Sequence, residues 1–153
     1  MANGALRVYL ENSVIGGYFD DEFKVYTHRL FEKFRKGIFK PIISSHVVVE
    51  LENGAPDHII ENLKTLEYEE YGVTDEMLSL AEKYMEQRIV SEKYYNDVLH
   101  IAVATVLKVD VLVSWNFKHI VNLNRIKSFN SVNLREGYGS LEIRSPREVI
   151  ENE

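Results

Sequence analysis

The sequence predicts an α/β protein in which helices cover both faces of a parallel sheet. Short apolar runs with strand character alternate with segments of helical periodicity along the chain, which is typical of βαβ units. The run "VDVLVSW" at 109–115 is apolar almost throughout, as expected for a strand covered on both faces. The segment "NDVLHIAVATVLKV" at 96–109 is apolar nearly all round, which predicts a buried helix.

The expected strands are short apolar runs that end at polar or turn-forming residues. They are 6–10 ("LRVYL"), 41–45 ("PIISS"), 68–74 ("YEEYGVT"), 109–115 and 140–146 ("SLEIRSP"). The second run ends in serines, which are suitable N-caps for a following helix. Pro41 and Pro146 fall at the edges of their runs, where a residue without an N–H group is tolerated.

The expected helices follow from apolar residues that recur every three or four positions. They cover 21–36, 46–54, 57–66, 75–88 and 96–109, and a further helical segment follows Asn116. Gly37 ends the first of these helices and Gly54 the second, as glycine commonly does. The helix over 75–88 has acids in its first turn, where the macrodipole favours negative charge.

Composition limits the class of protein. With 153 residues, of which 45% are hydrophobic and 27% charged, the chain is expected to form one domain over 1–153 with a proper core. It has no cysteine, which excludes thiolate chemistry and fits a cytoplasmic location. No secretory signal is recognisable, and no apolar run approaches the ~18–20 residues that span a bilayer, so no membrane contact is expected.

The net charge of −6 argues against tight nonspecific binding to nucleic acid, because phosphate contacts require a basic surface. Basic residues are concentrated in two stretches, 28–40 and 118–135. Each is expected to be a solvated helix face, and each is also a candidate lining for a groove. Brief, metal-assisted contact with nucleic acid is compatible with this composition.

Four polar side chains from distant segments are expected at one edge of the sheet. Glu11 follows the first strand, Glu50 lies about one turn into the helix after the second strand, Asp97 opens the buried helix, and Asn116 follows the strand "VDVLVSW". In parallel sheets the functional edge is the carboxyl end of the strands. Clustered carboxylates repel one another unless a cation or proton intervenes, and Mg²⁺ prefers oxygen ligands. The pattern therefore predicts a site for a hard cation.

Each of these residues also has a purely structural interpretation. Glu11 is compatible with a turn that caps a short helix, Asp97 with an N-cap of the buried helix, and Asn116 with a cap of the segment after it. Glu50 is the most informative of the four. It places a charge beside residues that should be buried, and lone charges are rarely buried without a partner.

Other chemistries find little support. His100 is interpreted as a packed or hydrogen-bonded core residue, and His119 either as a surface helix residue or as a residue near the strand edge. No two histidines have zinc-ligand spacing, so zinc is not expected. No glycine-rich phosphate loop is present, and the serines lack the sequence of a nucleophile elbow: Ser13, Ser44, Ser45 and Ser114.

Three segments resemble the motifs of PIN-domain proteins. "VYLENSVIGGYFD" (8–20) is similar to their opening strand and first acidic motif, and "ISSHVVVELENG" (43–54) to the second. "YNDVLHIAVATVLKVDVLVSWNFKHIVN" (95–122) resembles the third and fourth motifs together, and its "SWNFKHI" is like that of a VapC-like subgroup. The resemblance covers nearly the whole chain in the correct order, and the long combined motif is the specific part.

The resemblance implies a three-layer α/β/α sandwich with a central parallel sheet. It also implies Mg²⁺- or Mn²⁺-dependent endoribonuclease activity, with an RNA substrate, an antitoxin protein as partner and a homodimer as the assembly. Glu11, Glu50 and Asp97 would take the places of the metal-binding acids and Asn116 the fourth catalytic place. Two further residues would support them, Ser13, which matches the hydroxyl of the first motif, and Ser114.

Two residues depart from the family pattern. Glu11 stands where Asp is usual, which carries its carboxylate one methylene further, about 1.5 Å. Asn116 supplies a neutral oxygen where many relatives have Asp, although Asn recurs with "SW" in the subgroup. The alternative function is a catalytically weakened PIN-like module that binds RNA or protein, with the basic stretch 28–40 as its surface.

Overall fold

The computed structural model describes residues 4–151; residues 1–3 and 152–153, the ends of the domain expected over 1–153, lie outside this range. The strands are β1 (Leu6–Leu10), β2 (Phe39–Ser44), β3 (Glu69–Tyr71), β4 (Val111–Val113) and β5 (Ile143–Arg144). The helices are α1 (Asn12–Gly17), α2 (Lys24–Arg35), α3 (Ser45–Gly54), α4 (Asp57–Leu63), α5 (Asp75–Glu86), the 3-10 helix η1 (Glu92–Tyr94), α6 (Tyr95–Leu107), α7 (Leu123–Arg135) and α8 (Pro146–Glu151). Every strand and helix that the sequence predicts is present, with shifted ends.

The five strands form one sheet in the order β3-β2-β1-β4-β5, and every neighbouring pair is parallel. The first strand is central: Val8 lies beside Pro41 of β2 on one side and Val111 of β4 on the other. Because all strands run the same way, their carboxyl ends share one edge. Helices α1 and α3 and the loop after β4 leave from that edge.

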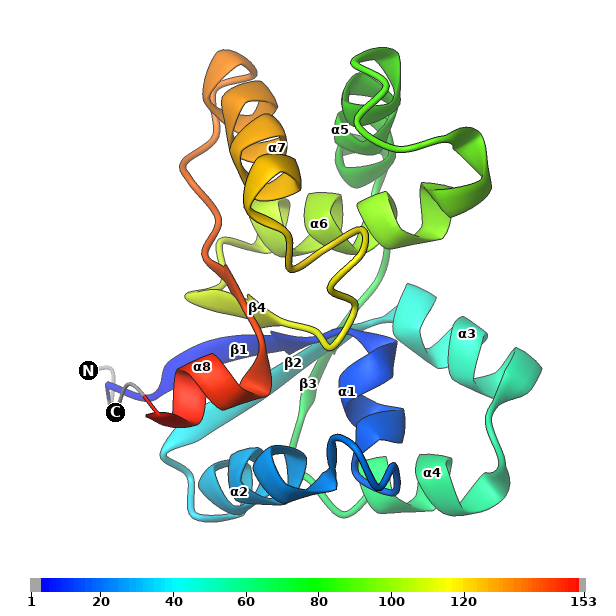
Figure 1. Cartoon of the computed structure of the whole chain (residues 1–153), viewed down its shortest axis with the longest axis vertical. Coiled ribbons are helices and arrows are strands. Elements are labelled where there is room, and N and C mark those ends of the chain that lie inside the picture. The colour runs from blue at the N-terminus through cyan, green and yellow to red at the C-terminus, as the bar shows by residue number, and fades with distance from the viewer. Residues whose placement is uncertain (1–3, 152–153) are drawn as a thin grey trace.

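Helices cover both faces of the sheet, which confirms the predicted α/β/α sandwich. Figure 1 shows α5, α6 and α7 on one side, with α5 and α7 projecting furthest, and α1, α2, α4 and α8 on the other. Within residues 4–151, none of the helices is both long and apolar enough to cross a bilayer.

Burial follows this layering. Val8, Tyr9 and Leu10 of the central strand are fully buried, as a strand covered on both faces requires. The middle of α6, residues 98–105, is buried without interruption, which explains why its sequence is apolar nearly all round. The strand and the helix therefore form a rigid base for the polar residues that follow β1 and begin α6.

The start of β2 differs from the prediction. The strand begins at Phe39, two residues earlier than expected, and places Pro41 inside it. Pairing with β3 begins only at Ile42, so β2 is still an edge strand at Pro41, where proline is tolerated.

The C-terminal end also differs, because the strand predicted over 140–146 is only two residues long. Ser145 ends it and caps α8: its hydroxyl accepts from the backbone N–H of Glu148 (3.2 Å), and the Glu148 carboxylate accepts from the N–H of Ser145 (3.0 Å). Pro146 occupies the first helical position. This is a capping box with Pro at N1, a readable signal for a helix that the strand interpretation overlooked.

Candidate active site

The site lies at the carboxyl edge of β1 and β4, beside the start of α3 and α6. Glu11 directly follows β1 and caps α1, so the capping interpretation of this residue is correct. Its side chain is nevertheless only 6% exposed, which a solvent turn would not require. The residue therefore combines a structural cap with a buried carboxylate.

Hydroxyl and amide groups occupy three acceptor positions of the Glu11 carboxylate. Oε1 accepts from Ser13 Oγ at 2.5 Å and from Ser114 Oγ at 2.6 Å, and Oε2 accepts from the Ser13 N–H at 3.1 Å. A carboxylate offers about four lone-pair positions, so these three bonds leave room for one more ligand. Both serines expected to support the site lie in contact with its first acid.

The same serines join the loop after β4 to the loop after β1. Ser13 Oγ accepts from the N–H of Trp115 at 2.8 Å, and Ser114 Oγ accepts from the N–H of Asn116 at 2.9 Å. The side-chain oxygen of Asn116 accepts from the N–H of His119 at 3.0 Å and caps the turn that follows. The structural interpretation of Asn116 is thus correct for this oxygen.

Glu50 ends a chain of hydrogen bonds that runs into the core. His100 Nε2 lies 2.7 Å from Glu50 Oε1, His100 Nδ1 lies 2.7 Å from the Tyr9 hydroxyl, and that hydroxyl lies 2.9 Å from Ser44 Oγ. An ionised carboxylate only accepts, so Nε2 is the donor to Glu50. His100 is 1% exposed, which confirms its interpretation as a hydrogen-bonded core residue.

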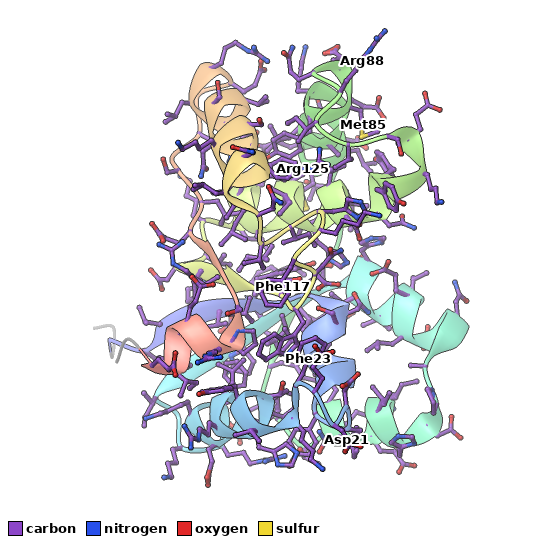
Figure 2. All side chains as sticks on the ribbon, viewed as in Figure 1. Asp21, Phe23, Met85, Arg88, Phe117 and Arg125 are labelled. Atoms are coloured by element: carbon purple, nitrogen blue, oxygen red, sulfur yellow. The ribbon has the colours of Figure 1, made fainter. Side chains whose placement is uncertain are left out.

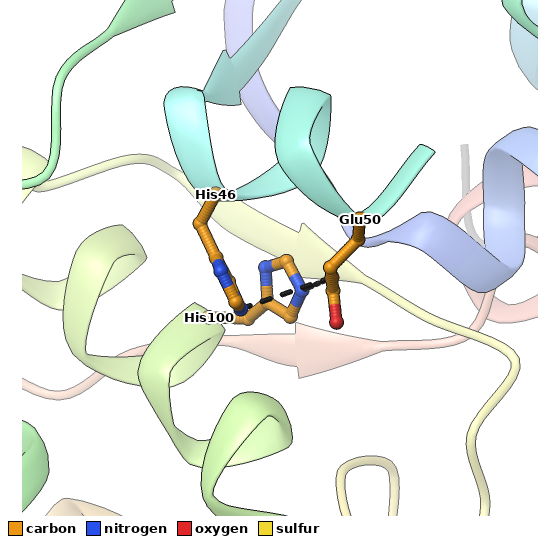
Figure 3. Close-up of side chains that lie close together, drawn as sticks. All are labelled: His46, Glu50 and His100. Atoms are coloured by element: carbon orange, nitrogen blue, oxygen red, sulfur yellow. Dashed lines mark hydrogen bonds and ion pairs between the residues drawn. The ribbon is translucent and has the colours of Figure 1, made fainter. Parts of the chain in front are cut away.

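Two imidazoles flank the Glu50 carboxylate, because His46 lies one turn before it on α3 (Figure 3). His46 Nε2 is 3.8 Å from Glu50 Oε1, and one ligand atom from each of His46, Glu50 and His100 lies within 4.8 Å of the others. Burial opposes the ionisation of Glu50, but the hydrogen bond from His100 and the nearby histidines leave its pKa below the usual value. Burial and His100 lower the pKa of His46, which favours the neutral imidazole that metals bind.

Asp97 lies in the first turn of α6, and its carboxylate pairs with His119. The helix begins at Tyr95, so the interpretation of Asp97 as an N-cap is wrong. Asp97 Oδ2 is 3.1 Å from His119 Nδ1, and the Tyr94 ring lies 3.7 Å from the His119 ring, centroid to centroid. His119 is 6% exposed, so it is a buried residue near the strand edge.

The acids influence one another without direct contact. Burial, followed by the negative charge of Glu11, raises the pKa of Asp97 against the opposing effect of His119. Within residues 4–151, no Lys or Arg side chain forms an ion pair with Glu11, Glu50 or Asp97. Glu50 and Asp97 each lie beside an imidazole, and Glu11 receives only hydroxyl and amide donors. Carboxylate oxygens without a Lys or Arg partner are suitable ligands for a divalent cation. Only Glu50 belongs to the compact group with His46 and His100; Glu11 and Asp97 lie outside it.

Spacing arguments overlooked His46 and Tyr9. His46 and His100 are far apart in the chain, so a search for zinc-like spacing cannot pair them. The sequence did indicate one pair of neighbours: His46 and Glu50 are spaced i and i+4, which places both on one face of a helix. Tyr9 reads as an ordinary apolar strand residue, and only its contact with His100 gives it a polar role.

No protein-family model and no curated protein sequence matches the chain. Among solved structures, the chain is similar to VapBC2 from Rickettsia felis, which was solved bound to a DNA fragment from its promoter. The TM-score is 0.58 and the identity 14%, over 90% of this chain and 98% of that chain. VapC20 from Mycobacterium tuberculosis, a sarcin–ricin loop cleaving toxin, has a TM-score of 0.50 and 13% identity, covering 88% and 98%.

The chain therefore has the PIN-like fold of VapC structures, as its motifs imply. Tyrosyl-tRNA synthetase from Aeropyrum pernix also matches, with a TM-score of 0.50 and 8% identity, over 92% of this chain and 52% of that chain. A fold shared by such different proteins does not determine an activity, which must be argued from the site itself.

Proposed function

We propose that this chain is a metal-dependent endoribonuclease of the PIN/VapC type and the toxin of a toxin–antitoxin pair. One observation supports the proposal: among the described residues, none of the three carboxylates Glu11, Glu50 and Asp97 has an ion pair with Lys or Arg, and the charge of Glu11 acts on Asp97. The negative charge of such carboxylates has no Lys or Arg partner among the described residues, and a divalent cation would neutralise it.

Glu11, Glu50 and Asp97 would hold Mg²⁺ or Mn²⁺. When bound, such a cation supplies positive charge for the phosphate oxygens and makes water a better nucleophile. Ser13 and Ser114 hold the Glu11 carboxylate in place, because their hydroxyls donate to it. In the metal-free protein, burial and the charge of Glu11 raise the pKa of Asp97, so a bound cation would relieve an unfavourable charge there. A carboxylate beside the activated water would accept its proton.

Asn116 completes the catalytic set as a positioning residue. Its oxygen caps the turn that carries His119, and its amide nitrogen remains available to orient a water or a phosphate. The protein's own residues thus align the substrate and accept a proton, and the reaction yields 3′-hydroxyl and 5′-phosphate ends.

Cleavage of RNA in the presence and absence of divalent cation tests the proposal. Wild-type protein with Mn²⁺ or Mg²⁺ should cut RNA into products with 5′-phosphate ends, and chelation or Asp97→Asn should abolish cutting. Asp110→Asn is the matched control, because Asp110 lies at the opposite end of β4. Products with 2′,3′-cyclic phosphate ends would contradict this mechanism.

A second candidate function is RNA or protein binding without cleavage. The Glu11 carboxylate favours this function, because it accepts three hydrogen bonds from Ser13 and Ser114. These bonds hold a side chain that is longer than the usual Asp and leave fewer of its lone pairs for a cation. The two functions differ in their response to metal. Binding of RNA with no metal-dependent cleavage would favour the second.

The proposed partners are an antitoxin protein and a second copy of the chain. The proposed location is the cytoplasm, and residues 1–153 are proposed to form one PIN-like domain. Support for the antitoxin is the likeness to VapBC2, which was solved as a complex bound to promoter DNA. Co-expression of the chain with its genomic neighbours, followed by mass determination of the purified complex, tests both partners. A monomer with no bound neighbour would contradict them.

A further inference from the structure

A basic cavity lies beside the site, between the end of α5 and the start of α7. It has a volume of about 700 Å³, and its lining includes Arg88, Lys118, Arg125 and His119. Figure 2 labels Arg88 at the end of α5 and Arg125 near the start of α7. Its one acidic lining residue is Glu92, so cations outnumber acids on its walls.

The cavity continues along α7 as a groove. A second hollow of about 430 Å³ shares Arg88 with the first and adds Lys127 and Arg135, and a third of about 320 Å³ shares Arg125. From Arg125 to Arg135 the helix rises about 15 Å, enough for about four nucleotides at the ~3.4 Å spacing of a stacked strand. We call these three hollows the α7 groove.

The cations of the α7 groove are largely uncompensated. Among the described residues, Arg88, Lys118 and Lys127 form no ion pair, whereas Arg135 is 3.8 Å from Glu136. Arg125 donates to the carbonyl of Ile89, which fixes its guanidinium at the wall without neutralising it. Unpaired positive charge on a chain of net charge −6 marks this surface as complementary to a polyanion.

The groove reaches the partner of one acid. His119 lines the first cavity and also pairs with Asp97, so one side chain belongs to both. The half-buried Tyr94 ring contacts His119 at an interplanar angle of 37°, has Lys93 Nζ 5.4 Å from its centroid, and also lines the cavity. A row of cations along a groove is the arrangement that contacts the phosphates of single-stranded nucleic acids.

We propose that the α7 groove binds the phosphate backbone of single-stranded RNA and guides it past Tyr94 to the acids. This proposal rests on the proposed function and adds the path of the substrate. The other basic stretch, 28–40, is less suited. Arg29 lies over the Tyr26 ring and Arg35 over the Tyr18 ring, on α2, across the sheet from α5 and α7 (Figure 1).

The test measures RNA binding without cleavage. A fluorescent oligouridylate about 12 nucleotides long, within the ~4–16 nucleotides of typical single-strand sites, is titrated with protein in EDTA at several salt concentrations. Arg88→Gln with Lys127→Gln should weaken binding about 25-fold at ~0.1 M salt, a factor of about 5 for each lost phosphate contact. The slope of log Kd against log salt should fall by about 1.4.

Arg29→Gln with Lys36→Gln is the matched control, because it replaces one exposed arginine on α2 and the exposed lysine at its C-cap, and it should leave Kd unchanged. Equal weakening by the two pairs, or no RNA binding by the wild type, would overturn the proposal. So would equal competition by polyglutamate, which would identify a site for an acidic peptide. Because binding is measured in EDTA, these outcomes are separate from a failure of metal-dependent cleavage.

Discussion

Ser114 Oγ donates a 2.6 Å hydrogen bond to Oε1 of Glu11, a residue 103 positions earlier in the chain. Ser13 donates to the same oxygen. The first acid of the site is thus held by hydroxyl groups from two loops at the carboxyl ends of β1 and β4. These bonds position the carboxylate, and they leave one of its acceptor positions free for a further ligand.

Replacing Ser114 with Ala should destabilise the protein. The substitution leaves a buried carboxylate oxygen one donor short and removes the acceptor of the Asn116 N–H, so we expect a loss of about 1–3 kcal/mol. Urea unfolding at neutral pH measures it. Ser140→Ala, at an exposed position, should change stability by less than about 0.5 kcal/mol. Equal effects of the two substitutions would show that the bond to Glu11 contributes nothing.

Asp97→Asn should raise the stability of the metal-free protein at neutral pH. Burial and the charge of Glu11 raise the pKa of Asp97, so folding favours its protonated form. The stability that this group contributes is fully present below the unfolded pKa of ~3.9 and is lost as pH rises through the folded pKa. At neutral pH the ionised Asp97 therefore opposes folding, and a neutral Asn does not. Water screens this half-buried group, so we expect at most about 1 kcal/mol, or a rise in Tm of about 2–4 °C. Thermal unfolding in EDTA at pH 7 and pH 4 measures it, and the gain should shrink toward pH 4.

When metal is added, the wild type should become more stable than Asp97→Asn, which is the reverse of their order in EDTA. A cation that binds only the folded state stabilises by about 2.7 kcal/mol at a hundredfold excess over Kd. Mn²⁺ should therefore raise the Tm of the wild type and leave that of Asp97→Asn unchanged. A similar rise in both proteins would place the metal away from Asp97.

The histidines beside Glu50 predict a preference among metals. Imidazole is a better ligand for Mn²⁺, Co²⁺ or Zn²⁺ than for Mg²⁺, which requires oxygen. The wild type should therefore gain more thermal stability from Mn²⁺ than from equal Mg²⁺, and His46→Gln should remove the difference. His58→Gln is the matched control, because His58 lies on α4 outside the group. Equal responses of the wild type to both metals would contradict an imidazole ligand.

Much of the fold could be predicted because its strands and helices are encoded locally. Apolar runs identified the strands, and the continuous apolar run "VDVLVSW" indicated that helices cover both faces of the sheet. The elements that were not predicted are short. Helix α1 contains Gly16 and Gly17, which lower helix propensity, and α8 follows so closely on β5 that the capping residue Ser145 was assigned to the strand.

The position of Glu11 beside the loop after β4 could be predicted, because parallel strands bring their carboxyl ends to one edge. The partners of the acids could not, because those contacts depend on how distant segments pack. His100 meets Tyr9 across 91 positions and Glu50 across 50, and neither separation has a sequence signature. The loop of Ser114 likewise meets Glu11 only because β1 and β4 are neighbours in the sheet.

Gly17 provides the last prediction, because it lies against the indole of Trp115 just behind the site. A Cβ atom at Gly17 would lie 2.9 Å from Trp115 Cδ1 and Nε1 and 3.2 Å from Thr27 Oγ1. The ring cannot easily move, since Nε1 donates to Thr27 Oγ1 at 2.9 Å and Phe23 stacks on it. Gly17→Ala should therefore cost about 1–3 kcal/mol of stability by overpacking. Gly16→Ala is the adjacent control: nothing lies within 4 Å of its added Cβ, so it should stabilise α1 by about 0.5–1 kcal/mol. Urea unfolding of both variants measures the contrast, and a stabilising Gly17→Ala would mean that the loop carrying Ser114 and Trp115 moves freely relative to α1.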